Sequence, residues 1–63
     1  MVKTVRADKI MPGDRHRVYG EVKNIRVRND GRSIDIFFQN LYVGEDKRPI
    51  PMFCVPSTML EME

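Results

Sequence analysis

An alternating strand that directly follows a tight turn constrains this sequence more than any other feature. Over Ser33–Phe38, apolar residues alternate with more polar ones, which is the period-two pattern of a half-buried strand. The preceding Asn29-Asp30-Gly31-Arg32 is a hairpin signal, because glycine supplies a positive φ and aspartate tolerates a tight turn. The sequence therefore predicts a hairpin in which Ile25–Arg28 pairs with Ser33–Phe38, with one face formed by Ile34, Ile36 and Phe38.

The remaining segments predict further short strands. Val18, Gly20 and Val22 alternate on one parity and residues 25 and 27 on the other, so the slip at Lys23-Asn24 predicts a β-bulge. Other strands are expected at Thr4–Ala7, Leu41–Val43, Met52–Val55 and Leu60–Met62. Connecting segments are expected as a helical turn over Lys9–Met11, a turn at Met11–Asp14, an exposed loop over Gly44–Pro49 and a turn at Pro56–Thr58.

Five or six short strands and no long helical pattern predict an all-β fold. In 63 residues they form one domain, residues 1–63, which we expect to be a small antiparallel barrel with a short 3₁₀ turn. Closure removes the unpaired edges of an open sheet. The core is thin, since so short a chain buries only about 60% of its unfolded surface. The expected core residues are Val5, Ile10, Val18, Val22, Ile25, Val27, Ile34, Ile36, Phe38, Leu41, Val43, Phe53, Val55 and Leu60.

Two stretches resemble a known family of small proteins. Ala7–Asp14, with its Pro12-Gly13-Asp14 turn, and the following Val18-Tyr19-Gly20-Glu21-Val22 look like the opening of Src-homology-3-like barrels. The turn Pro56-Ser57-Thr58-Met59 before a last strand fits the same plan. Proteins of this shape occur among bacteriophage and actinobacterial products, many of them without known function. The resemblance implies a fold and no activity.

Several functional classes are disfavoured by composition. A single histidine, His16, and a single cysteine, Cys54, cannot complete a four-ligand zinc site. His16 is expected at a surface turn and Cys54 as a small apolar residue. The four glycines are isolated, so no phosphate-cradling loop is present. We therefore expect no enzyme, catalytic residue, cofactor, metal or small-molecule substrate, and little room for a pocket. No apolar run is long enough to span a membrane, and a cytoplasmic location is expected.

The charge distribution favours nucleic acid as the partner. The net charge is only +2, but residues 1–32 hold nine basic and four acidic residues, a net charge of +5, whereas residues 33–63 have a net charge of −3. Basic residues beside exposed aromatic rings are typical of proteins that bind single strands, because cations follow phosphates and rings stack on bases. Small barrels can equally place an arginine-rich hairpin against a duplex groove. The expected nucleic-acid-binding residues of the 23–37 hairpin are Lys23, Arg26, Arg28, Arg32 and Phe37. Asp30 and Asp35 lie within the same patch.

A protein partner is the alternative. The segment Phe37–Val43 is the most apolar in the chain, and not all of its side chains fit one core. An exposed apolar cluster marks a partner or self-association site. The alternative is therefore a protein-interaction module, either a homodimer subunit or a phage-type regulator of a host protein, using the apolar 37–43 and 52–60 surface. Its expected interface residues are Phe37, Tyr42 and Met59.

Overall fold

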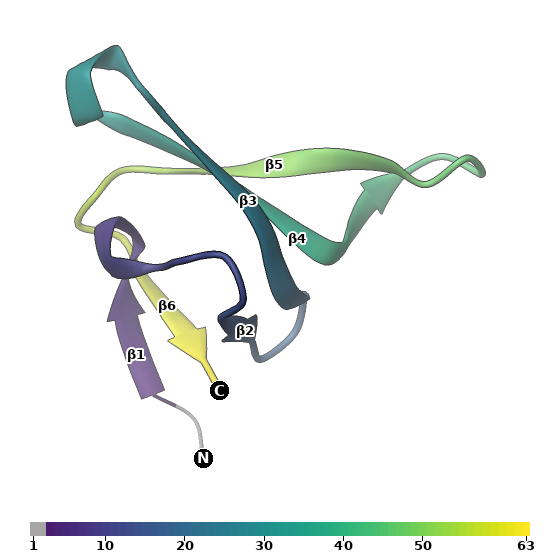
Figure 1. The fold of residues 1–63 in the computed structure, drawn as a ribbon, viewed down its shortest axis with the longest axis horizontal. Coiled ribbons are helices and arrows are strands. Elements are labelled where there is room, and N and C mark those ends of the chain that lie inside the picture. Colours follow the sequence, from purple (N-terminus) through teal and green to yellow (C-terminus); the bar gives the residue numbers. More distant parts are fainter. Residues whose placement is uncertain (1–2) are drawn as a thin grey trace.

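The chain folds as six antiparallel strands in one sheet (Figure 1). The structure is a computed structural model, and it describes residues 3–63. The strands are β1 (Lys3–Arg6), β2 (Arg15–His16), β3 (Gly20–Arg28), β4 (Ser33–Val43), β5 (Arg48–Cys54) and β6 (Met59–Met62), and two 3₁₀ turns are η1 (Ala7–Lys9) and η2 (Asn29–Gly31). The prediction of an all-β chain with a short 3₁₀ turn is confirmed. Within residues 3–63, no helix has the length and apolar character needed to cross a membrane.

The sheet does not close, so the predicted barrel is wrong in this respect. The strand order is β1-β6-β2-β3-β4-β5, which leaves β1 and β5 as edges. The reason lies in strand length, since β4 has 11 residues while β1 has 4 and β2 has 2. The long β3–β4 and β4–β5 hairpins extend away from β1 instead of curling back to it (Figure 1). Pro49 and Pro51 remove backbone donors from β5, which protects this edge from unwanted pairing.

The predicted central hairpin and its bulge are confirmed. Ile25 pairs with Ile36 and Arg28 with Ser33. The register shifts between Val22 and Asn24, so Lys23 is the extra residue of the bulge. The turn requires positive φ at Asn29 (53°), Asp30 (56°) and Gly31 (90°), a conformation that asparagine, aspartate and glycine tolerate best.

Several segments differ from the prediction: β2 is a strand where none was expected, and the ends of several others shift by one or two residues. The expected strand Leu41–Val43 is the end of β4, not a separate element. β5 begins at Arg48, inside the expected loop Gly44–Pro49. The helical turn forms over Ala7–Lys9, because the Ala7 N–H donates to the Thr58 carbonyl and draws the turn toward the segment before β6.

The core lies between the β3–β4–β5 hairpins and the β1–β6 pair. Its buried side chains are Ala7, Ile10, Val22, Ile34, Ile36, Phe38, Cys54, Leu60 and Met62. Five expected core residues are instead exposed, namely Val18, Val27, Val43, Phe53 and Val55. In β5, Met52 and Cys54 pair with Ile36 and Ile34, so the intervening Phe53 points to the opposite face. Val18 lies in the connection after β2, and Val27 and Val43 lie near strand ends that extend past the core.

His16 is buried, contrary to the expected surface position. Its Nδ1 accepts hydrogen bonds from the Val18 N–H (3.0 Å) and the Tyr19 N–H (3.2 Å). Its ring stacks on Tyr19 and meets Phe38 edge-on, with centroids 5.0 and 5.1 Å away. Burial lowers the pKa of His16 below its ordinary value of 6.5, and the nearby Glu61 carboxylate partly opposes this. His16 therefore acts as a neutral capping group of the β2–β3 connection.

Candidate nucleic-acid interface

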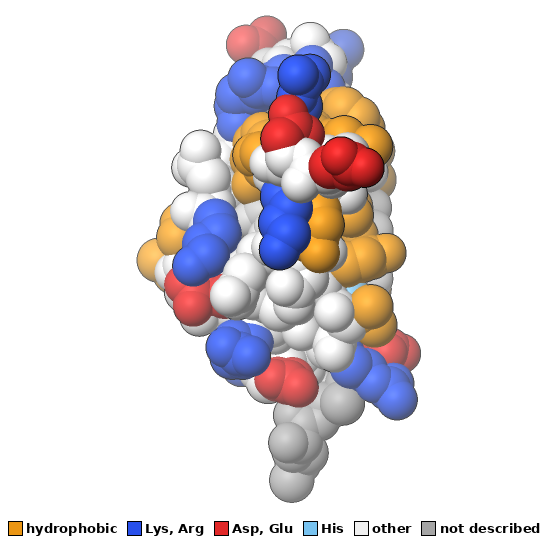
Figure 2. Space-filling model, turned by 90° about the vertical axis from the view of Figure 1, so that its right-hand side faces the viewer, with side chains coloured by type: hydrophobic (Ala, Val, Ile, Leu, Met, Phe, Trp, Pro, Cys, Tyr) orange, Lys and Arg blue, Asp and Glu red, His pale blue; other side chains and the backbone are white. Residues whose placement is uncertain are grey.

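One face of the β3–β4–β5 hairpins turns away from the core, and we call it the outer face. Two cross-strand rows define it: Arg26, Asp35 and Phe53 lie opposite one another, and so do Asn24, Phe37 and Pro51. Arg28 and Ser33 form the next row toward the hairpin turn. On the side of the molecule that Figure 2 shows, basic side chains gather at the upper end, beside a band of hydrophobic side chains.

Asp35 is the centre of the outer face. Its side chain is fully buried, and its Oδ2 lies 3.0 Å from both Arg26 Nη2 and Arg28 Nε. Arg26 Nε also donates to the same oxygen at 3.3 Å. The other oxygen, Oδ1, is buried without a hydrogen-bond partner among the described residues. Two guanidinium groups therefore share one carboxylate oxygen, which leaves one positive charge in excess.

Phe53 extends this charged cluster with an aromatic surface. The Arg28 guanidinium carbon lies 5.4 Å from the Phe53 ring centroid, within the range of a cation–π contact. Phe53 nevertheless remains 69% exposed, so most of its surface faces solvent. An arginine and a ring in this arrangement offer both a phosphate contact and a stacking surface.

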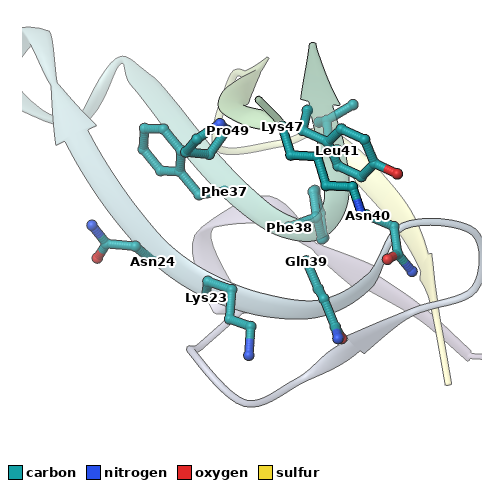
Figure 3. A pocket seen from close by; sticks show the side chains of 10 residues that line it. Lys23, Asn24, Phe37, Phe38, Gln39, Asn40, Leu41, Lys47 and Pro49 are labelled. Carbon is teal, nitrogen blue, oxygen red and sulfur yellow. The ribbon is translucent and has the colours of Figure 1, made fainter. Parts of the chain in front are cut away.

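A groove adjoins the outer face where β4 bends away from β5. The register shifts between Phe37 and Tyr42, and the Asn40 N–H donates to the Tyr19 carbonyl at 2.9 Å instead of pairing with β5. The resulting open groove has a volume of about 670 Å³ (Figure 3), which contradicts the expectation of little room for a pocket. It is lined by Lys23, Asn24, Phe37, Phe38, Gln39, Asn40, Leu41, Tyr42, Lys47 and Pro49.

The groove combines cations, aromatic rings and side-chain amides. Lys47 Nζ lies 5.8 Å from the Tyr42 ring centroid, and Lys23 Nζ lies 3.5 Å from a Glu21 carboxylate oxygen outside the groove. Among the described residues, the groove lining contains two lysines and no acidic side chain. The amides offer donors and acceptors for the edges of a polar ligand, so the groove suits an anionic ligand with flat rings.

Most of the predicted nucleic-acid-binding residues lie together. Arg26, Arg28 and Phe37 share the outer face, and Lys23 lines the adjoining groove. Arg32 is separate, since it is exposed at the end of the hairpin turn. Of the predicted protein-interface residues, Phe37 and Tyr42 line the groove, whereas Met59 lies on β6 opposite Arg6 of β1.

Sequence reasoning missed three contributors to this surface. Asp35 lies opposite Arg26 because of the hairpin register, and the turn sequence, which sets that register, could have predicted this pair. The sequence predicts Phe53 in the core. In an entirely apolar strand, the pattern does not show which of the two alternating sets of side chains faces inward. Lys47 lines the groove beside the register shift between β4 and β5, and no local pattern predicts that shift.

The described residues offer little for metal or thiol chemistry. In residues 3–63 no group of three histidine, cysteine, aspartate or glutamate side chains is placed to hold a metal ion. Burial raises the pKa of the Cys54 thiol, and the Asp35 carboxylate adds to this. The thiol therefore stays protonated and behaves as an apolar core group.

Comparison with known proteins gives no relative: no family model, curated protein or solved structure matches this chain. Function is therefore inferred from the chain's own surface.

Proposed function

We propose that this protein is a non-enzymatic module that binds nucleic acid through the outer face and the groove. The observation that carries this proposal is the position of Phe37. It lies opposite Asn24 on the outer face and also lines the groove, so it joins the arginine pair to the two groove lysines. Cations and aromatic rings thus follow one another along a single surface, formed by Arg26, Arg28, Phe53, Phe37, Lys23, Tyr42 and Lys47.

Single strands suit this surface better than a duplex. In a single strand the bases are free to stack on Phe37 and Tyr42 while the lysines and arginines contact the phosphates. Side-chain amides at Gln39 and Asn40 are available for base edges. The protein is proposed to act in the cytoplasm. The Pro12–Asp14 turn before a long bent strand supports a relationship to Src-homology-3-like proteins of bacteriophage or actinobacterial type.

A titration with labelled oligonucleotides tests the proposal. The wild-type protein is titrated into short single-stranded and double-stranded probes at two salt concentrations. We expect micromolar binding that prefers the single strand and weakens as salt rises, because released counterions drive phosphate contacts. Phe37→Ala weakens binding about tenfold through loss of stacking.

Val18→Ala is the matched control, since Val18 is 67% exposed and does not line the groove. Its affinity remains that of the wild type, and thermal unfolding of both variants confirms that they are folded. Absence of any salt-dependent binding in the micromolar range contradicts the proposal.

A protein partner is the second candidate, and the exposed apolar residues of the 37–43 and 52–60 segments favour it. Tyr42 is 44%, Phe53 69% and Met59 53% exposed, and large exposed apolar side chains mark association sites. The open edge β1 adds a means of pairing with a second chain, whereas the prolines of β5 disfavour pairing at the other edge. Light scattering on the wild type and on Tyr42→Asp tests self-association. A monomeric wild type rules out the homodimer.

A further inference from the structure

We propose that Arg26, Arg28 and Phe53 form a nucleotide subsite, and that the buried Asp35 is the positioning residue that holds the two arginines. In this subsite the guanidinium groups bind one phosphodiester and the adjacent base stacks against Phe53. The inference rests on the proposed nucleic-acid-binding function and adds to it a defined phosphate site, a second stacking surface and a role for an acidic residue.

Asp35 holds the two arginines in place. Arg26 Nη2 and Arg28 Nε each lie 3.0 Å from the same Oδ2 atom, so the carboxylate holds two like-charged groups side by side. Two free guanidinium groups on neighbouring positions of one strand repel each other. The buried carboxylate offsets that repulsion and fixes both side chains before a ligand arrives, which reduces the entropy lost on binding.

Both arginines keep N–H groups free for a ligand. A guanidinium has five N–H donors, more than the contacts of either arginine with Asp35 can engage, and its fork matches phosphate oxygens. The side chains are 60% and 44% exposed, so their outer N–H groups face solvent. Because one carboxylate faces two guanidinium groups, the cluster retains a positive charge for a phosphodiester.

Phe53 supplies an aromatic ring beside the two arginines. Arg28 packs near one part of the Phe53 ring, and the ring is still 69% exposed. A phosphate held by Arg28 places its nucleoside within reach of that ring. The row Arg26–Asp35–Phe53 therefore presents a phosphate contact and a stacking surface on three adjacent strands.

Burial of the Asp35 carboxylate is unfavourable for folding. Its Oδ1 is buried without a partner among residues 3–63, and such an atom in a folded protein calls for an explanation. A buried ion pair adds little stability compared with an apolar residue of similar size. The presence of a buried carboxylate beneath two arginines is therefore better explained by ligand binding than by folding.

The experiment measures binding of a labelled oligothymidine strand over a series of salt concentrations, and Asp35→Asn is the decisive variant. A simple charge model predicts tighter binding and a steeper salt dependence, because the change removes a negative charge from the patch. A positioning role predicts the opposite: we expect affinity to fall about tenfold, since two long side chains must then be ordered on binding.

Lysine substitutions separate geometry from charge. Arg26→Lys and Arg28→Lys keep the charge, so the salt dependence is unchanged while affinity falls several-fold through loss of the fork. Arg28→Gln lowers the slope of log K against log salt by about 0.7, the value for one phosphate on a single strand. Phe53→Ala lowers affinity about tenfold with an unchanged slope. The matched control is Arg17→Lys, because Arg17 pairs with an exposed glutamate, and its affinity stays that of the wild type.

The outcomes distinguish the subsite from the general function. If the wild type binds and Phe37→Ala weakens it, but the variants at Asp35, Arg26, Arg28 and Phe53 bind as the wild type does, the subsite is wrong and the proposed function stands. Tighter binding by Asp35→Asn overturns the positioning role. If Asp35→Asn does not fold, the two lysine variants test the subsite instead: wild-type affinity in both shows that the arginine geometry does not matter and overturns the proposal. If the wild type does not bind at all, both proposals fail.

Discussion

The two faces of β4 bury their side chains in different ways. Ile36 and Asp35 are neighbours in sequence and both are 0% exposed. Ile36 is covered by the apolar core that the β1–β6 pair completes, whereas Asp35 is covered by the side chains around it on the outer face, including two arginines. Long basic side chains can cover a surface with their stems while their charged ends stay in water. Full burial therefore does not by itself identify the core of this protein.

The two faces of β4 also differ in what burial contributes to the stability of the fold. Burial of Ile36 is favourable because apolar surface leaves water. Burial of Asp35 carries a desolvation cost that its arginines must offset. We infer that the core face supplies most of the folding free energy, while the outer face contributes less and keeps its charged groups accessible to a ligand.

The largest effect is expected from a cavity on the core face. Ile36→Ala removes a fully buried side chain and lowers the free energy of unfolding by about 3 kcal/mol, as is typical for such a truncation. Val27→Thr is the control, because Val27 is 60% exposed and threonine preserves the branched shape favoured in strands. It changes stability by less than about 0.5 kcal/mol. Urea unfolding measures the free energy of unfolding of both variants. Equal losses in the two would contradict the inference that the core face supplies most of the folding free energy.

A smaller loss of stability is expected from changes on the outer face. Its size depends on whether the carboxylate of the ion pair is buried, and not on the distance between the paired atoms. Arg26→Gln with Arg28→Gln leaves Asp35 buried without a counter-ion and costs about 2 kcal/mol or more. Arg17→Gln breaks a pair of the same 3.0 Å length, but both partners are exposed, so it costs under about 1 kcal/mol. Adding Asp35→Asn to the arginine double variant restores part of the loss, since it removes the uncompensated charge.

Urea unfolding also decides this comparison. If Arg17→Gln costs as much as the double variant, or Asp35→Asn lowers stability further in that background, the outer face is not organised around a buried carboxylate.

Features set by local chemistry were predictable from the sequence. The Asn29–Gly31 turn fixes its own φ angles, and the turn then fixes the register of the hairpin. The parity change at Lys23 locates the bulge, because each side of it has its own alternation. The grouping of Lys23, Arg26, Arg28 and Phe37 followed from the same parity argument.

Features set by distant segments were not predictable in this way. The openness of the sheet depends on the relative lengths of β1 and β4, which are far apart in sequence. Residues 52–55 are all apolar, so their pattern does not show that Cys54 faces inward and Phe53 outward. Burial of Asp35 depends on its cover by residues of other strands, and a charged residue in an alternating pattern is ordinarily assigned to solvent.

The smallest effect is expected from titration on the core side, at His16. Burial holds the pKa of the folded imidazole below 6.5, so at mildly acidic pH the unfolded chain binds a proton more readily than the folded chain. The contribution of neutral His16 to the free energy of unfolding is therefore present above pH 6.5. It is lost as the pH falls below that value, until His16 of the folded chain is protonated too. Protonation of Nδ1 also removes the acceptor of the Val18 and Tyr19 N–H groups.

Thermal unfolding between neutral and mildly acidic pH measures this loss in the wild type and in His16→Gln, which keeps an acceptor but does not titrate. We expect the wild type to lose stability as the pH falls through 6.5, and His16→Gln to be less stable at neutral pH but nearly independent of pH over this range. A wild type that gains stability on acidification, or a His16→Gln variant with the same pH dependence as the wild type, shows that this imidazole is not held neutral by the fold. Such a result means that another residue causes the pH dependence, and that His16 is not a neutral polar group buried beside the core.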